Sequence, residues 1–390
     1  MSKQAGFLLL LATTATSVGA ELRPISDDRL SEVTGQAFVS VDRQYHPDET
    51  DNTSYTRVNL GMDVDIQTNI DTLEIGRYER DGEDAGSSDV LIDNFSLGYI
   101  NNQPYFDRNP KFARQYKPDG SAYAEGEIVP FTLRNPFFEF AFDEATEEVV
   151  GVRLGFGEAM GVLSGDFQSL TGNVNIDIVD QGEGLSEANT DGNLFDAIIV
   201  ALAPYLVGNN AITSRAELVY GAEGDPRLGE LDPIRAQYAG VPNGETFVVE
   251  DVPFFTRLLI QGAGAFSSSQ IEVHGSDVHI IAQDCQVLGI QACFSLTDFK
   301  SLPVGELGEI NGERAIIGPE SGLFLSFQTQ DLDWLDDVSK TELTPEDFIR
   351  ATRGGFFNIP NGSVEFNLNE ALGGIERQRV EYIDRGQGLF

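Results

Sequence analysis

The stretch FFEFAFDEATEEVVGVRLGF, residues 137–156, carries the clearest fold signal in the chain. Large apolar side chains recur at every second position on either side of the polar DEATEE: Phe138, Phe140 and Phe142, then Val150, Val152, Leu154 and Phe156. A two-residue period places such side chains on one face of a strand. Two runs of this kind, joined by a short polar segment, predict a β-hairpin with one apolar face.

The stretch VNLGMDVDIQTNID, residues 58–71, has the same period. Its apolar positions are Val58, Leu60, Met62, Val64, Ile66 and Ile70. The pattern predicts a strand with one apolar and one polar face. The apolar face suits a folded core, a membrane or an apolar partner, and a soluble core is the interpretation that the other residues favour.

Short alternating segments recur along the chain between clusters of Gly, Asn, Asp and Ser, for example at residues 90–100, 172–180, 322–330 and 362–370. No long helical segments alternate with them. The sequence therefore predicts a mainly β protein with an antiparallel sandwich-like or solenoidal architecture and a few short helices.

Three segments outside the N-terminal region predict helices. Residues 343–355, LTPEDFIRATRGG, place Thr344 at an N-cap, Asp347 in a capping box and Gly354 past the end. Residues 232–240 predict a second short helix. Residues 194–208 predict a buried helix that is too short to cross a bilayer.

The first residues, MSKQAGFLLLLATTATSVGA, combine one lysine, an apolar run and small residues before Ala20. This pattern is typical of a signal peptide and predicts export to the periplasm, the outer-membrane surface or the extracellular space. The expected organisation is a signal peptide at 1–20, a short helix at 21–35 and a β domain at 36–180. An irregular and helical insertion at 181–245 follows, and then a second β region at 246–390, which either stands alone or continues the first.

The chain has 63 acidic and 25 basic residues, with a formal net charge of −38. Such a charge repels phosphate backbones, so nucleic acid is not expected as a partner. The two cysteines, Cys285 and Cys293, stand close together in sequence. In an exported chain they predict a disulfide, and two buried thiols are the alternative.

A short segment after the leader resembles a group of exported proteobacterial proteins, some of them assigned to pilus systems of the FilF type. The matching residues are Ser26, Asp27, Leu30, Ser31, Val33, Gly35 and Gln36. Residues 58–76 and 135–165 are also similar to that group. The resemblance implies export and a surface context, and it brings no catalytic motif.

Catalytic motifs are largely missing from the sequence. It has no Gly-x-Ser-x-Gly elbow, His-Glu-x-x-His helix or phosphate-binding Gly-x-x-x-x-Gly-Lys loop. The histidines are His46, His274 and His279, and the last two predict a cross-strand pair on a hairpin or a two-ligand metal site. The chain is therefore expected not to be an enzyme, with a carbohydrate-active enzyme that uses a carboxylate pair as the alternative.

Two Asp- and Gly-rich segments suggest calcium ligands. The candidate ligands are Asp81, Glu83, Asp84 and Asp89 in one segment and Asn189, Asp191, Asn193 and Asp196 in the other. Solvated turns that contain Asp and Gly for backbone reasons are the alternative.

Residues 101–126 depart from the acidic background. Cationic and aromatic side chains make them a candidate surface for an acidic partner or for self-association: Arg108, Lys111, Arg114, Lys117, Tyr105, Phe106 and Tyr116. The segment DLDWLDD, residues 331–337, is a matching acidic element around Trp334. Aromatic side chains that pack down on the sheet are the alternative.

These observations together predict a secreted or cell-surface structural or adhesive β protein, as in a pilus or surface-assembly system. An outer-membrane β-barrel is the first alternative, because period-two strands and a terminal Phe390 also suit that class. The carbohydrate-active enzyme is the second.

Overall fold

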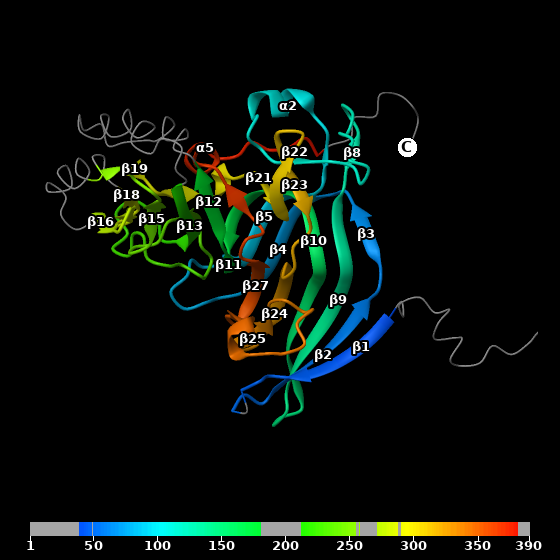
Figure 1. Cartoon of the computed structure of the whole chain (residues 1–390). Coiled ribbons are helices and arrows are strands. Elements are labelled where there is room, and N and C mark those ends of the chain that lie inside the picture. Colours follow the sequence, from blue (N-terminus) through cyan, green and yellow to red (C-terminus); the bar gives the residue numbers. More distant parts are fainter. Residues whose placement is uncertain are drawn as a thin grey trace, which may run out of the picture. The chain divides into compact units, whose positions relative to one another are not determined.

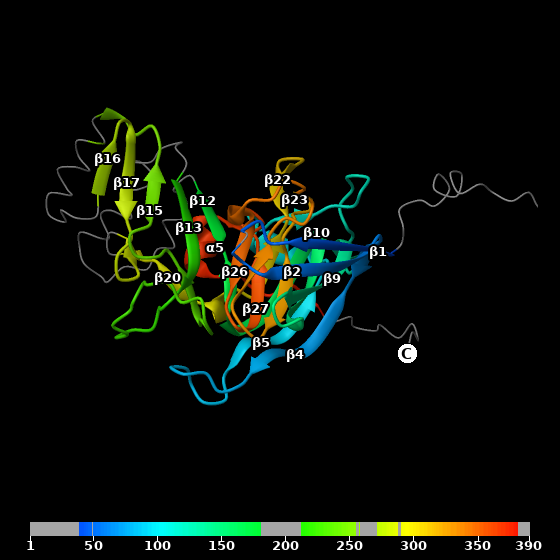
Figure 2. The ribbon, with the colours of Figure 1, turned by 90° about the horizontal axis from the view of Figure 1, so that it is seen from below.

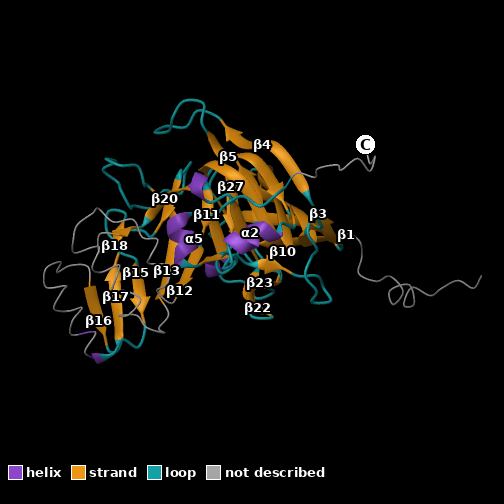
Figure 3. Ribbon diagram, turned by 90° about the horizontal axis from the view of Figure 1, so that it is seen from above, coloured by secondary structure: helices purple, strands orange, loops and turns teal. Residues whose placement is uncertain are grey.

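Strands dominate the structure, a computed structural model that describes residues 39–48, 50–180, 212–254, 257, 271–287 and 290–380. All of them belong to one unit, Phe38–Phe390. The described residues contain two short α-helices, α2 (Gln103–Arg108) and α5 (Leu368–Gly373) (Figure 3). The predicted mainly β fold with a few short helices is confirmed, and most strand pairs are antiparallel.

The largest sheet has 11 strands. They are β1 (Val39–Tyr45), β2 (Thr53–Leu60), β3 (Asp63–Ile66), β4 (Thr68–Arg77), β5 (Ser88–Leu97), β9 (Phe131–Asp143), β10 (Glu148–Leu170), β11 (Gly172–Val174), β21 (Ser301–Val304), β24 (Phe324–Gln328) and β27 (Gly354–Ile359). Its central path runs β1-β2-β9-β10-β24-β27-β11.

A second sheet has eight strands. They are β12 (Ile176–Asp180), β13 (Ile212–Val219), β14 (Tyr238–Gly240), β15 (Thr246–Val249), β16 (Ile271–His274), β17 (Asp277–Ile281), β20 (Cys293–Ser295) and β28 (Glu365–Phe366). Figure 2 shows β15, β17 and β16 side by side.

Four small sheets complete the strands of the described residues. They pair β22 (Glu306–Ile310), β23 (Glu313–Gly318) and β7 (Arg114–Gln115); β25 (Leu332–Leu335) and β26 (Phe348–Ala351); β18 (Gln286–Val287) and β19 (Ile290–Gln291); and β6 (Tyr99–Ile100) and β8 (Ile128–Val129). Among these described strands, the pairs β11–β27, β12–β28 and β23–β7 are parallel.

The predicted hairpin at residues 137–156 lies at the centre of the large sheet. Its two strands, β9 and β10, run side by side in Figure 1. The 23-residue β10 pairs with β24 through its first half and with β5 and β21 through its second. A register shift between Val149 and Gly151 changes which valine faces solvent. The alternation predicts that Val150 shares a face with Val152, but Val150 is buried and Val149 is exposed instead.

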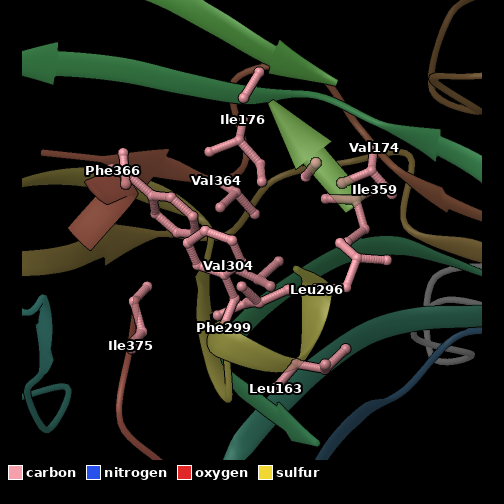
Figure 4. Close-up of a cluster of buried hydrophobic side chains, with 14 of the residues drawn as sticks. Leu163, Val174, Ile176, Leu296, Phe299, Val304, Ile359, Val364, Phe366 and Ile375 are labelled. Atoms are coloured by element: carbon pink, nitrogen blue, oxygen red, sulfur yellow. The ribbon is translucent and has the colours of Figure 1, made fainter. Parts of the chain in front are cut away.

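The later part of the chain completes the sheet begun by the earlier part. Strands β21, β24 and β27 all lie beyond residue 300 and join the 11-stranded sheet. One apolar core contains side chains from both large sheets, among them Leu163, Val174, Ile176, Leu296, Phe299, Val304, Ile359, Val364, Phe366 and Ile375 (Figure 4). Residues 290–380 thus share a core with residues 50–180.

Two predicted helices are wrong. At residues 343–355 the capping box of Thr344 and Asp347 is present, but it starts only the 3₁₀ turn Pro345–Asp347. The chain then enters β26, which pairs with β25, so tertiary pairing overrides the local helix signal. At residues 232–240, Arg235 has a φ of 51° and Tyr238–Gly240 form β14, which pairs with β13 and β20.

Several predictions fall on residues outside the described part of the chain. These are the signal peptide at 1–20, the helices at 21–35 and 194–208, and the calcium segment at 189–196. Within the described residues, no helix has the length and apolar composition needed to cross a membrane.

Some apolar side chains of residues 58–71 pack against the main core, and others lie outside it. Val58 is the register partner of Phe138 on β9, whereas Val64 and Ile66 on β3 pack against the main core. The change coincides with Asn135 on β9, whose φ is 47° and whose N–H donates to the carbonyl of Met62. Only the middle of the stretch therefore serves the core, since Ile70 near its end is 40% exposed.

Candidate binding face

Part of one face of the 11-stranded sheet is apolar and open to solvent. Eight large apolar residues on four strands are 37–63% exposed there: Val39, Val41 and Tyr45 on β1, Phe138 on β9, Val149, Val152 and Leu154 on β10, and Phe327 on β24. We call this surface the open face.

The strand register shows that these side chains share one side of the sheet. One row of successive partners crosses five strands: Val41, Val58, Phe138, Leu154 and Leu325. The next row is Arg43, Thr56, Phe140, Val152 and Phe327. Partners that lie directly opposite each other on paired strands project to the same face.

The opposite face of the same strands is covered by the β25–β26 hairpin. Trp334 on β25 is fully buried, and its ring lies 5.7 Å from that of Tyr55. Beneath it, Glu139 pairs with Arg153 at 2.5 Å and with Arg57 at 2.9 Å. Burial lowers the pKa of Arg153, and the Glu139 charge opposes that effect.

This part of the sheet is thus apolar on both faces, because its covered side also holds the buried side chains of Tyr55, Ala141, Val150, Phe324 and Phe356. Sheets with one solvated face usually place apolar side chains against the core and polar ones in water. Here the covered side holds the ion group among its apolar side chains, while Phe138 and Phe327 face solvent. The two rows of the open face contain no carboxylate, and their single charge, Arg43, pairs with Glu144 at 2.6 Å.

The size of the open face matters because contiguous exposed apolar patches of more than a few hundred Å² mark interaction sites. Eight large apolar side chains at 37–63% exposure form a patch of that order. A standard protein interface needs roughly 800 Å² from each partner. The open face can therefore supply most of the apolar centre of such an interface.

The aromatic part of the predicted surface at residues 101–126 is wrong. Tyr105 and Phe106 are each 1% exposed, and both pack against Phe112. These rings belong to the main core, which is the alternative that the sequence left open.

Three of the four predicted cations of this segment form ion pairs within the chain. Arg108 pairs with Glu376, Arg114 with Glu313 and Lys117 with Glu127. The Tyr116 hydroxyl donates to Glu313, and the Lys111 carbonyl accepts a hydrogen bond from Arg314. In the acidic segment at residues 331–337, Trp334 is buried, and Asp331 and Asp333 pair with Arg350, whereas its role as a counterpart stays a prediction.

Asp89 is not a calcium ligand. It is fully buried, and its Oδ1 accepts hydrogen bonds from Arg235 at 2.9 Å and from Arg80 at 3.2 Å. Its Oδ2 accepts from the backbone N–H of Gly355. The other predicted residues of this segment, Asp81, Glu83 and Asp84, stay in an exposed or half-buried turn.

Two other sequence predictions are confirmed. Cys285 and Cys293 form a disulfide. The rings of His274 and His279 lie 4.7 Å apart on the β16–β17 hairpin, as expected for a cross-strand pair. Among the described residues, the group that could hold a metal ion through three ligands lies elsewhere, at His46, Asp51 and Asp333.

Sequence reasoning missed both the buried ion group and the His46 group. Glu139 and Arg153 did leave a signal, because each is an ionised residue inside an otherwise apolar strand. His46 and Asp333 left none, since 286 residues separate them in the chain. Comparison of the chain with protein-family models, with curated proteins and with solved structures found no match.

Proposed function

We propose that this protein is a structural component of an exported cell-surface assembly, and that two copies associate through their open faces. The observation that carries the proposal is the open face itself, an apolar sheet surface with no carboxylate in its two central rows. The leader-like residues 1–20 and the disulfide support an exported protein, because disulfides persist in oxidising compartments.

The charge distribution favours a second copy as the occupant. Two chains of formal charge −38 repel each other over most of their surfaces. At the open face two copies can approach without unpaired carboxylates in the two central rows, because the carboxylate that reaches these rows, that of Glu144, is paired with Arg43. Face-to-face packing of two sheets at about 10 Å also buries apolar side chains of both copies, and it makes an isologous contact.

The salt dependence of association distinguishes contact through the open face from association driven by opposite charges. Added salt screens the repulsion between copies, so association through the open face should tighten as NaCl rises. An interface between the acidic chain and a basic partner should instead weaken.

The test compares the mass of the full chain with that of a Phe138→Ser/Phe327→Ser variant by sedimentation equilibrium. Ile317→Ser on β23 is the control, because Ile317 is 46% exposed but lies outside the open face. The proposal expects wild type and control to form dimers in high salt, and the double variant to stay monomeric at the same concentration. A monomeric wild type, or a double variant that dimerises like wild type, contradicts it.

A lipid surface is the competing occupant, and the same proteins test it. Wild type that remains monomeric but sediments with neutral phosphatidylcholine vesicles, while the double variant does not, would assign the open face to lipid. That result would overturn self-association.

A further inference from the structure

A hollow of about 410 Å³ lies beside the connection between β1 and β2. Its lining includes His46 and Asp51 from that connection, Asp143 from the end of β9, and Gln330 and Asp333 near β25. Segments far apart in sequence thus bring acidic and imidazole groups to one place. No step in the proposed association uses them.

His46 is positioned to offer a ring nitrogen to this hollow. Its side chain is 5% exposed, and its ring packs against Phe348 at 4.6 Å between centroids. Nε2 is buried and has no hydrogen-bond partner among the described residues, and it lies 4.0 Å from Oδ2 of Asp333. A buried ring nitrogen without a partner is costly unless something binds it.

The carboxylates of Asp51 and Asp333 are each held in place by a contact to one of their two oxygens. Asp51 Oδ1 accepts the backbone N–H of Thr53 at 2.8 Å. Asp333 Oδ1 lies 3.2 Å from Nη1 of Arg350, which leaves Oδ2 toward His46. Such outer contacts orient carboxylates in metal sites.

We propose that His46, Asp51 and Asp333 bind a divalent transition-metal ion such as Zn²⁺. One ligand atom from each residue lies within 4.8 Å of the others, as a shared ion requires. An imidazole with two carboxylates suits zinc, whereas calcium takes only oxygen ligands. Asp48 and Asp143 in the lining add negative charge that attracts a cation.

Metal binding has a defined consequence for the ring proton. The backbone N–H of Asp48 donates to Nδ1 of His46 at 3.2 Å, so the neutral ring carries its proton on Nε2. A metal ion at Nε2 requires the ring proton on Nδ1 instead. The Asp48 contact is then lost, and the Asp48 amide should show the change.

The ion would join the β1–β2 connection of the large sheet to the β25–β26 hairpin. His46 and Asp51 lie between β1 and β2, whereas Asp333 lies on the β25–β26 hairpin, which carries the buried Trp334 and covers the sheet. An ion bound only in the folded state therefore raises the melting temperature through ligand linkage.

The test titrates ZnCl₂ into the full chain by calorimetry, with His46→Gln and Asp51→Asn as site variants and His274→Gln as the control. Asn at position 51 keeps an oxygen that can accept the Thr53 N–H, so this variant is expected to fold. We expect one Zn²⁺ per chain, with affinity at least about tenfold weaker in both site variants and unchanged in the control. In wild type, Zn²⁺ should also shift the amide resonance of Asp48.

Three results would overturn the proposal. They are no saturable binding of Zn²⁺, equal affinity in wild type and Asp51→Asn, or loss of binding in His274→Gln, which would assign the ion to the His274–His279 pair. A rise in melting temperature that equal ionic strength of NaCl reproduces would also count against it.

Discussion

Glu139 and Arg153 are register partners on β9 and β10, and Oε2 of the glutamate lies 2.5 Å from Nε of the arginine. Both side chains are buried, and Arg57 pairs with the other oxygen of Glu139. Arg153 also donates to the carbonyl of Leu335 and lies 5.1 Å from the ring of Trp334. The ion group therefore ties the centre of the sheet to the hairpin that covers it.

Replacing Glu139 should destabilise the protein strongly. In Glu139→Gln two guanidinium groups remain buried beside a neutral partner, and loss of one partner of a buried ion pair costs about 3–5 kcal/mol. Urea denaturation followed by the fluorescence of Trp334, the only tryptophan, measures the loss. The control is Glu144→Gln, which breaks the exposed pair with Arg43 and should cost less than about 1 kcal/mol. Equal losses in the two variants would contradict this account.

The disulfide should contribute measurably to stability. Cys285 and Cys293 close a short loop, for which the chain-entropy model gives about 2–3 kcal/mol. The Cys285→Ser/Cys293→Ser variant should therefore unfold at lower urea than wild type. Intact mass after alkylation of the native protein should show no modified thiol, and two modified thiols would refute the pairing.

Asp232 should make stability depend on pH in the acid range. Burial raises the pKa of Asp232 from 3.8 to about 6. Between these values the folded state keeps a proton that the unfolded state has lost, so the contribution of Asp232 to stability falls as pH rises from about 4 to 6. Above pH 6 the contribution should stay constant.

Asp232→Asn isolates this effect because its side chain is neutral at every pH. The melting temperature of the variant minus that of wild type should increase from pH 4 to pH 6 and then level off. A difference that is constant over this range would show that Asp232 titrates alike in both states.

The sequence was sufficient to predict the strands but not which face would be covered. The alternation of Phe138 and its neighbours identifies β9, yet a period of two is equally consistent with either face being buried. Glu139 and Arg153 occupy positions that look solvent-facing in that pattern. Their cover, the β25–β26 hairpin, comes from about 180 residues further along the chain, so no local pattern could reveal it.

The errors around the candidate site have the same origin. Trp334 stands among four aspartates, which suggests an exposed segment, but β25 alternates and turns Leu332 and Trp334 inward. The His46 group depends on the approach of Asp333, a contact between distant segments. The Cys285–Cys293 pair was predictable because its two members are close in sequence.

The most direct test of the central claim measures whether the open face becomes covered when copies associate. Both native cysteines are in the disulfide, so a cysteine at Val152 on the open face, or at Ile317 as the control, is the single reactive thiol of its variant. The rate of alkylation at position 152 should fall as protein concentration rises through the range in which the sedimenting mass doubles, while the rate at position 317 stays constant. A rate at position 152 that is independent of concentration, or an equal fall at both positions, would contradict the claim that the open face is the interface.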